Sequence, residues 1–120
     1  MIAGQLPMSE GKPAYKGLLG GGAITVSDAN AAARICALNV LAQAAAALDG
    51  NLDRIAACVR LGVFVAASSD FTEHPLVANG ASDLIVEVLG EAGLHARAAV
   101  GCSSLPLGVP VEVEAMFEVR

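Results

Sequence analysis

The strand expected at residues 111–119 constrains the fold of this chain more than any other stretch. Its side chains alternate between apolar and mostly acidic, and successive side chains of a strand point to opposite faces of a sheet. One face therefore belongs to a hydrophobic core and the other carries a row of carboxylates. The apolar set is Val111, Val113, Ala115, Phe117 and Val119, and the other set is Glu112, Glu114, Met116 and Glu118.

Arg97 opens the β-rich segment that precedes this strand, and Pro106, Gly108 and Pro110 punctuate the loop between the two. We therefore expect two strands joined by a turn, with Arg97 near the carboxylate row. An arginine held there would grip an anionic ligand with two parallel hydrogen bonds, beside a candidate general base. The alternative is a structural ion pair on a solvated strand face, which would contribute little to stability.

The rest of the chain alternates between strands and helices. We expect a strand at 1–4, a glycine-rich connector at 7–25, a helix capped by Ser27 that ends near Leu48, a central strand at 55–66 and a helix at 75–90. Arg60, inside the central strand, should face solvent or a partner subunit. The expected apolar helix faces are Ile35, Leu38, Leu41, Ala45 and Leu48 on the first helix, and Leu76, Leu84, Val88 and Leu89 on the second.

The glycines of the connector match neither the dinucleotide-binding pattern nor the P-loop pattern, so a phosphate-binding loop is not expected. A flexible connector that can approach a cleft fits better, and Gly22 within it is a candidate substrate contact.

Length and charge exclude several classes of protein. The 120 residues fit one domain, 1–120, and 55% of them are hydrophobic, which is more apolar surface than a small core hides, so we expect an oligomer. A net charge of −5 argues against a nucleic-acid surface. The alanine-rich run at 31–48 is interrupted by Arg34, Asn39 and Gln43. Because a membrane span needs about 20 apolar residues, we do not expect this run to cross a membrane.

The cysteines and histidines do not predict a metal site. Cys36, Cys58 and Cys102 are widely spaced and odd in number, which indicates buried free thiols in a reducing compartment. No secretory signal is visible, so we expect a cytoplasmic protein. His74 has no second metal ligand at suitable spacing and is expected to be a surface or capping residue, whereas His95, two residues before Arg97, is a minor candidate for ligand contact.

Three segments, in order, resemble the Rid/YjgF family of reactive-intermediate (imine) deaminases. They are Ile2–Pro7, then Val63–Val65 with Asp70 and Phe71, and finally Arg97–Val100 with Leu105–Ala115. The resemblance implies an α+β, chorismate-mutase-like fold, in which two helices pack on one face of a mixed sheet. It also implies a homotrimer with a cleft at each subunit interface.

The same resemblance implies a chemistry. Family members hydrolyse 2-imino acids and their enamine tautomers to 2-keto acids and ammonia, without a metal or an organic cofactor. By residue matching, Arg97 would hold the substrate carboxylate, Glu112 would orient the attacking water, and Asn79 would lie near the cleft. Asn79 precedes Gly80, however, and could equally mark a bend or a close helix–sheet contact.

Departures from the family pattern leave other functions open. The usual N-terminal segment, with a cleft-reaching tyrosine, is expected to be missing, and Tyr15 is not expected to replace it. Ala98 and Ala99 stand where the family often has serine and cysteine. The alternative is a non-catalytic trimer that binds small carboxylates through Arg97, although a mere binder would not need Glu112. A chorismate-mutase-like isomerase ranks third, because no second cation accompanies Arg97.

Overall fold

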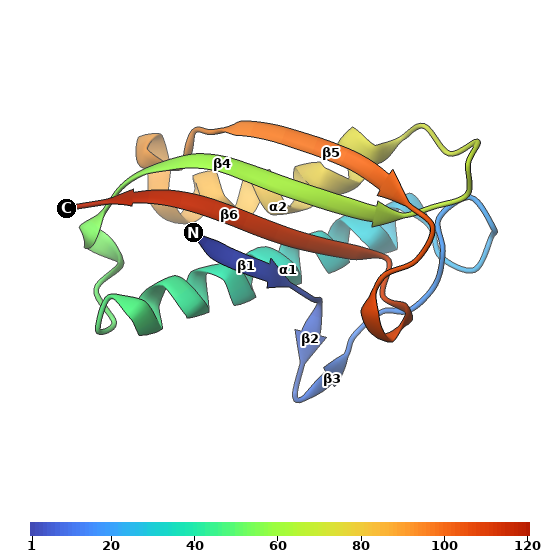
Figure 1. Cartoon of the computed structure of the whole chain (residues 1–120), viewed down its shortest axis with the longest axis horizontal. Coiled ribbons are helices and arrows are strands. Elements are labelled where there is room, and N and C mark those ends of the chain that lie inside the picture. The colour runs from blue at the N-terminus through green and yellow to red at the C-terminus, as the bar shows by residue number, and fades with distance from the viewer.

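A computed structural model describes all residues, 1–120, as a four-stranded mixed sheet with two helices on one of its faces (Figure 1). The α+β architecture expected from the sequence is therefore confirmed. In chain order the elements are β1 (Ile2–Gln5), β2 (Met8–Ser9), β3 (Lys12–Pro13), α1 (Val26–Ala47), β4 (Ile55–Ala66), α2 (His74–Leu89), β5 (Ala96–Cys102) and β6 (Val111–Val119), with single 3₁₀ turns at Leu52–Arg54, Gly90–Gly93 and Pro106–Gly108.

β4 is the centre of the sheet, whose strand order is β1-β6-β4-β5. It spans the residues predicted for the central strand, pairs antiparallel with β6 and runs parallel to β5. A parallel pair needs a crossover, and α2 supplies it. The expectation that these two strands, joined by a turn, lie side by side is therefore wrong. β5 and β6 follow one another in the sequence, but β4 lies between them in the sheet. The connector also contains a small hairpin, formed by β2 and β3.

The cap of the first helix lies two residues before the expected one. Thr25 is the N-cap, and its Oγ1 accepts a hydrogen bond from the backbone N–H of Asp28 at 3.0 Å. Ser27 lies inside the helix, so the prediction that it is the cap is wrong. Thr25 and Ser27 both carry a hydroxyl that could serve, and the backbone geometry at Thr25 decides between them.

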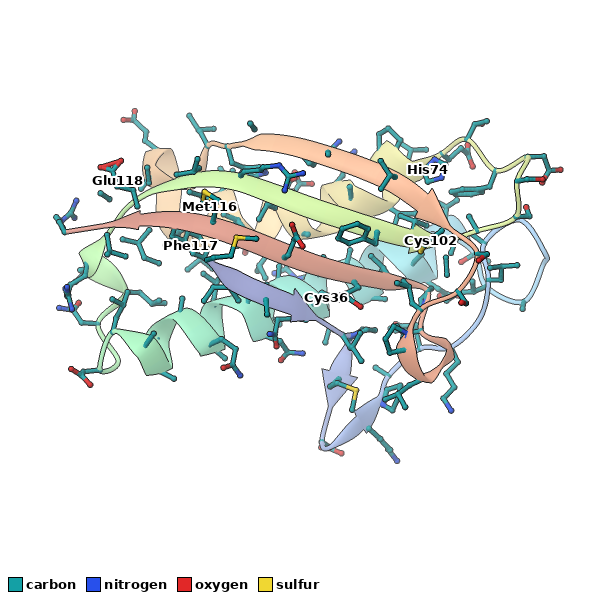
Figure 2. All side chains as sticks on the ribbon, in the orientation of Figure 1. Cys36, His74, Cys102, Met116, Phe117 and Glu118 are labelled. Carbon is teal, nitrogen blue, oxygen red and sulfur yellow. The ribbon has the colours of Figure 1, made fainter.

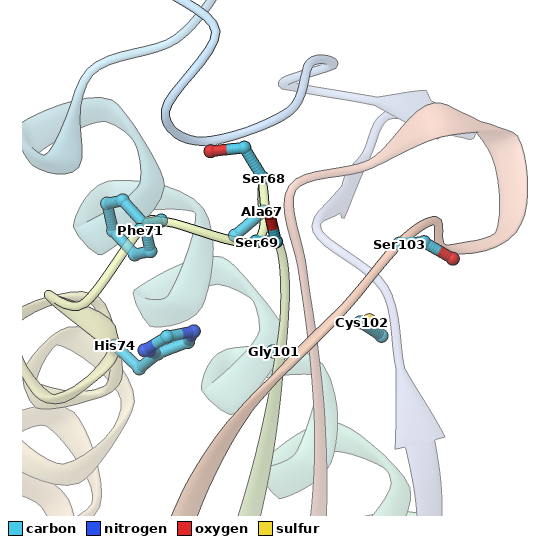
Figure 3. A pocket seen from close by; sticks show the side chains of 8 residues that line it. All are labelled: Ala67, Ser68, Ser69, Phe71, His74, Gly101, Cys102 and Ser103. Carbon is cyan, nitrogen blue, oxygen red and sulfur yellow. The ribbon is translucent and has the colours of Figure 1, made fainter.

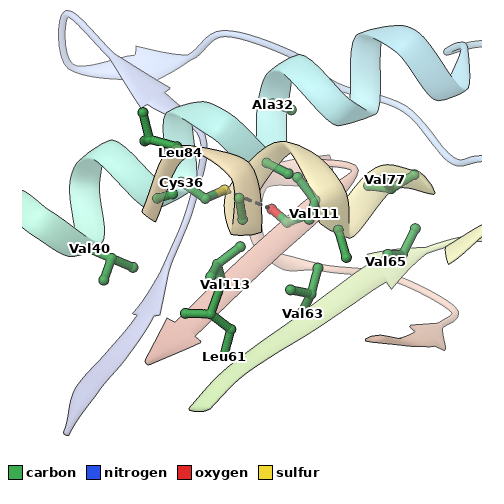
Figure 4. Close-up of a cluster of buried hydrophobic side chains, with 14 of the residues drawn as sticks. Ala32, Cys36, Val40, Leu61, Val63, Val65, Val77, Leu84, Val111 and Val113 are labelled. Carbon is green, nitrogen blue, oxygen red and sulfur yellow. Dashed lines mark hydrogen bonds between the residues drawn. The ribbon is translucent and has the colours of Figure 1, made fainter. Parts of the chain in front are cut away.

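The buried faces of both helices combine many small side chains with a few large ones, such as Leu84 (Figure 4). Leu38, Leu76 and Val88 were expected in the apolar faces, but they are 49%, 49% and 46% exposed. A Cβ added at Gly80 would collide with the backbone carbonyl of Asn30 on α1, so at this point the two helices lie too close for any side chain. The buried sets are Ala29, Ala32, Ala33, Cys36, Ala37, Val40, Leu41 and Ala44 on α1, and Val77, Ala78, Gly80, Ala81, Leu84 and Ile85 on α2.

The opposite face of the sheet carries no helix (Figure 1). Val100 and Met116 are 48% and 42% exposed, and Figure 2 shows Met116 together with Glu118 on β6. Arg60 is exposed and pairs with Glu114 at 3.3 Å, which confirms that it does not enter the core. This helix-free face is therefore part apolar and part charged. Neither helix has the length and apolarity needed to cross a bilayer.

Candidate active site

Arg97 lies near the start of the edge strand β5, on the side that faces the helices. Its register partner on β4 is Leu61, which is fully buried, and paired residues share a face. The Arg97 guanidinium reaches α2, where Nη1 donates to Asn79 Oδ1 at 2.9 Å and to Ser82 Oγ at 3.1 Å.

The other edge of the same guanidinium is free. Neither Nε nor Nη2 has a partner within the chain, and Arg97 pairs with no carboxylate. The alternative that Arg97 forms a structural ion pair is therefore wrong. Because Nε–H and Nη2–H present two parallel donors, this edge matches the two oxygens of a carboxylate.

Asn79 contacts Arg97 directly through its side chain, and its place near a cleft stays a prediction. Its Oδ1 must face Arg97, because a guanidinium can only donate. Its Nδ2 has no partner in the chain and is available to a ligand. α2 continues unbroken through this position, and the close contact belongs to Gly80 and α1 rather than to Asn79 and the sheet.

Glu112 lies on the helix-free face of β6. Its register partner is Phe64, and its side chain covers Gly4 of β1, where a Cβ would collide with the carboxylate. It has neither a hydrogen-bond nor an ion-pair partner in the chain. Glu114, the other candidate carboxylate, is held by Arg60. Glu112 is thus the carboxylate that remains free to act on a water molecule.

The structure does not bring Arg97 and Glu112 together within one chain, so the expectation that Arg97 lies beside the carboxylate row is wrong. The reason is that β4 separates their strands by about two strand spacings, or about 10 Å. In addition, Arg97 points toward α2, whereas Glu112 points away from both helices. A site containing both residues therefore requires two copies of the chain.

Gly22 lies in the exposed turn before α1, with φ at +82°, a backbone conformation that favours glycine. A Cβ there would meet nothing within 4 Å. No contact within the chain joins Gly22 to Arg97 or Asn79, so its role as a substrate contact stays a prediction.

Beyond Arg97, along β5, an open cavity of about 350 Å³ lies where β4 and β5 end (Figure 3). His74 lines it as the first residue of α2; the cap is Glu73, so His74 does not cap the helix. The His74 ring packs edge-on against Phe71, with centroids 5.1 Å apart. Its Nε2 would be 2.7 Å from a Cβ at Gly101, so glycine makes room for it.

All three cysteines are free thiols, as predicted, and two of them are buried. Burial raises the pKa of Cys36 well above its ordinary value and raises that of Cys58 to about 11. Cys102, half-buried at the cavity of Figure 3, also has a raised pKa, chiefly because of burial and then because of the negative charge of Glu112. Raised pKa values make these thiols poor nucleophiles near neutral pH.

Ser82 was missed by sequence reasoning, although it contacts Arg97 as closely as Asn79 does. A signal existed, because Asn79 and Ser82 are three residues apart and therefore share a helix face. The histidine before Arg97 was noted, and its ring proves to contact Ser82: His95 Nε2 is 2.9 Å from Ser82 Oγ.

A mixed sheet covered on one face by two helices places the chain among the α+β proteins. The chain belongs to the YjgF family: residues 1–118 match the family described as "YjgF/chorismate mutase-like, putative endoribonuclease".

Several individual proteins are similar to this chain over nearly all of its length. Protein TCP17 of Trypanosoma cruzi is 51% identical over 120 residues, which is 99% of this chain and 74% of the relative. The crystal structure of Atu1372, a protein of unknown function from Agrobacterium tumefaciens, is 51% identical with a TM-score of 0.96, covering 98% of this chain and 74% of that one. A protein from Shewanella oneidensis, described as a putative endoribonuclease, is 38% identical with a TM-score of 0.92, and the coverage is 98% and 76%.

Proposed function

We propose that this protein hydrolyses reactive 2-imino acids and their enamine tautomers to 2-keto acids and ammonia. The observation that carries the proposal is the geometry of Arg97: one nitrogen is held by Asn79 and Ser82, and the opposite edge is free for a carboxylate. The unpaired carboxylate of Glu112 supports it, because imine hydrolysis needs one group that takes a proton from water.

The reaction needs little beyond positioning. Arg97 binds the substrate carboxylate through its Nε and Nη2 edge, and Glu112 accepts a proton as water attacks the imine carbon. A C–O bond forms as the C=N double bond becomes single, and Glu112 passes its proton to the substrate nitrogen, which gives a carbinolamine. Glu112 then moves the hydroxyl proton to the amino nitrogen, the C–N bond breaks to release ammonia, and the C=O bond of the 2-keto acid forms. An imine carbon is already electrophilic, so the scheme calls for no cofactor.

In this proposal, the complete site forms only when subunits assemble into an oligomer. Arg97 and Glu112 lie on opposite faces of one sheet, so a cleft between subunits would combine Arg97 of one copy with Glu112 of the next. The partly apolar helix-free face, with Val100 and Met116 exposed, supports burial against other copies. A closed trimer would bury three such faces and leave three equivalent clefts. The free thiols suit the reducing cytoplasm.

The first test measures ammonia and keto-acid release from imines generated in situ by an amino-acid oxidase. Arg97→Ala should lower kcat/KM at least ~100-fold, because the carboxylate loses its anchor. Glu112→Gln should lower turnover and leave binding of a 2-keto acid nearly intact. Full activity of Arg97→Ala would exclude the anchor role, and loss of keto-acid binding in Glu112→Gln would make Glu112 structural.

A subunit-mixing experiment tests the shared site. Arg97→Ala and Glu112→Gln subunits, each expected to have much lower activity alone, are unfolded together and reassembled in equal amounts. Random closed trimers would then have about one quarter of their clefts intact, with Arg97 from one variant and Glu112 from the other. Activity should return to about that fraction. Two Arg97→Ala preparations treated the same way serve as the control, and absence of recovery in the mixed sample would contradict a site shared between subunits.

A second function, non-catalytic binding of small carboxylates, is favoured by one observation. The binding half of the site, Arg97 with Asn79 and Ser82, is complete in a single chain, whereas Glu112 is remote. Keto-acid binding without accelerated ammonia release would establish this function instead.

RNA cleavage, which the family description mentions, receives no support from this chain. Its net charge is −5, and the helix-free face carries Glu112, Glu114 and Glu118, with Arg60 already paired.

A further inference from the structure

A chain of hydrogen bonds begins at Arg97 and ends at the backbone of the 3₁₀ turn before β5. Arg97 Nη1 donates to Ser82 Oγ at 3.1 Å, Ser82 Oγ is 2.9 Å from His95 Nε2, and His95 Nδ1 contacts the carbonyl oxygen of Gly93. Ser82 and His95 are both half-buried, and Gly93 is buried. These contacts join β5, α2 and the turn at Gly90–Gly93.

With the His95 imidazole neutral, the two ends of this series of hydrogen bonds fix the direction of each bond in it. The Gly93 carbonyl can only accept, so the proton of the neutral imidazole is on His95 Nδ1. His95 Nε2 then accepts, and the single hydroxyl proton of Ser82 is donated to it. The lone pairs of Ser82 Oγ are left for Arg97, which can only donate. His95 therefore determines which way the Ser82 hydroxyl turns.

The orientation of the Ser82 hydroxyl determines how the Arg97 guanidinium is held. With the Ser82 proton pointed at His95, Nη1 of Arg97 meets two acceptors, Ser82 Oγ and Asn79 Oδ1, one for each of its hydrogens. A long arginine side chain is otherwise free to rotate, and holding Nη1 fixes the plane of the guanidinium and the direction of its open edge. Without His95, the Ser82 hydroxyl could turn its hydrogen toward Arg97 and the acceptor would be lost.

We propose that Ser82 and His95 are positioning residues, which orient the free Nε and Nη2 edge of Arg97 toward the carboxylate of the substrate. The proposal rests on the proposed function only for the identity of that substrate. The hydrogen bonds and their direction involve only residues of this protein and do not depend on which substrate it binds.

Binding of 2-oxobutanoate, a 2-keto acid, tests the proposal. Ser82→Ala and His95→Gln should each raise its Kd about five- to tenfold, the size of the net contribution of one hydrogen bond, because the bond from Arg97 to Asn79 remains. Ser82→Thr keeps the hydroxyl and should bind like the wild type, as should Ser9→Ala, an exposed serine on β2. The double variant Ser82→Ala/His95→Gln should bind no more weakly than Ser82→Ala, because His95 acts through Ser82.

Kinetics separate positioning from a structural role. A misoriented Arg97 weakens carboxylate binding equally in the ground and transition states, so KM should rise by the same factor while kcat stays within about twofold. A structural role would instead lower the melting temperature and the amount of folded protein, with KM unchanged.

Nuclear magnetic resonance of the side chains gives a readout that does not depend on the substrate. Long-range ¹⁵N spectra should show the neutral Nδ1–H tautomer of His95, and ¹⁵Nε relaxation should show an ordered Arg97 that becomes mobile in Ser82→Ala and His95→Gln. If the wild type binds no keto acid, the proposed function fails and this measurement alone decides the positioning role. An Nε2–H tautomer, an Arg97 equally ordered in all variants, or additive effects in the double variant would overturn the proposal.

Discussion

At the scale of single residues, burial and hydrogen bonding decide which polar groups are available for chemistry. Glu114 is occupied by Arg60, and the thiol of Cys36 donates to the Val111 carbonyl. Arg97 is held along one edge only, by Asn79 and Ser82, and Glu112 makes no hydrogen bond or ion pair within the chain. Both groups therefore keep hydrogen-bonding capacity that a ligand or a water molecule could use.

The buried thiol of Cys58 predicts a loss of stability at alkaline pH. Burial raises its pKa from 9.0 to about 11 in the folded chain, so the folded state keeps a proton that the unfolded state has released. This contribution to the free energy of unfolding is complete below pH 9 and is lost as the pH rises from 9 to 11.

Urea unfolding between pH 8 and 11 measures this effect. Cys58→Ala should show a shallower decline than the wild type, although it starts lower because a buried side chain is shortened. Some decline should persist, since the pKa of Cys36 is raised as well. An unchanged slope in Cys58→Ala would mean that its thiol does not titrate in this range.

At the scale of elements, the first helix depends on a cap that precedes it. Thr25→Ala should lower the free energy of unfolding by about 1 kcal/mol, because the N–H of Asp28 loses its partner. Thermal or urea unfolding followed by circular dichroism measures it. Thr25→Ser keeps the hydroxyl and should be near neutral.

Ser27→Ala is the matched control for the position of the cap. Ser27 is exposed inside the helix, so its replacement should change stability little. A larger loss in Ser27→Ala than in Thr25→Ala would place the cap at Ser27 after all.

The sequence largely predicted which residues form helices and strands, but it did not predict which of these elements lie next to one another in space. The central strand was found at its observed bounds because a long apolar run marks it, and the alternation on β6 correctly separated buried Val111, Val113 and Ala115 from the acidic row. Of the large residues predicted on the helix faces, Leu41, Leu48 and Leu84 are buried. The exposed ones, Leu38, Leu76 and Val88, were wrong. The close contact between α1 and α2 at Gly80 was not predicted.

The relation between Arg97 and Glu112 shows where sequence reasoning fails. The order of strands in the sheet depends on how the crossover helix packs, which the sequence pattern does not reveal. In addition, the alternation of side chains along one strand does not predict which sheet face a residue of the next strand occupies, because a loop separates the two strands. The sequence therefore identified the residues of the candidate site but not their positions relative to one another. Register and strand order place them on opposite sides of the sheet.

At the scale of the whole molecule, the proposed trimer should depend on the helix-free face. Light scattering should give three times the 12.0 kDa chain mass, about 36 kDa. Val100→Asp or Met116→Lys should shift the mass toward that of the monomer, because a charge would have to be buried without a partner. Deaminase activity should fall in parallel.

Leu38→Lys provides the comparison. Leu38 is 49% exposed on α1, on the opposite side of the molecule from that face, and its replacement should leave the mass unchanged. Dissociation of Leu38→Lys with an intact Val100→Asp assembly would move the interface to the helices, and a monomeric wild type would exclude the trimer.

Two glycines lie beneath the acidic row of β6. A Cβ at Gly4 would collide with the Glu112 carboxylate, and a Cβ at Gly62 would lie 2.8 Å from Glu114 Cγ and 3.1 Å from Arg60 Nη1. The consequence is evolutionary. A descendant that gains a larger side chain at position 4 or 62 has to shorten or reorient the facing glutamate, so each glycine and its carboxylate should change as a pair.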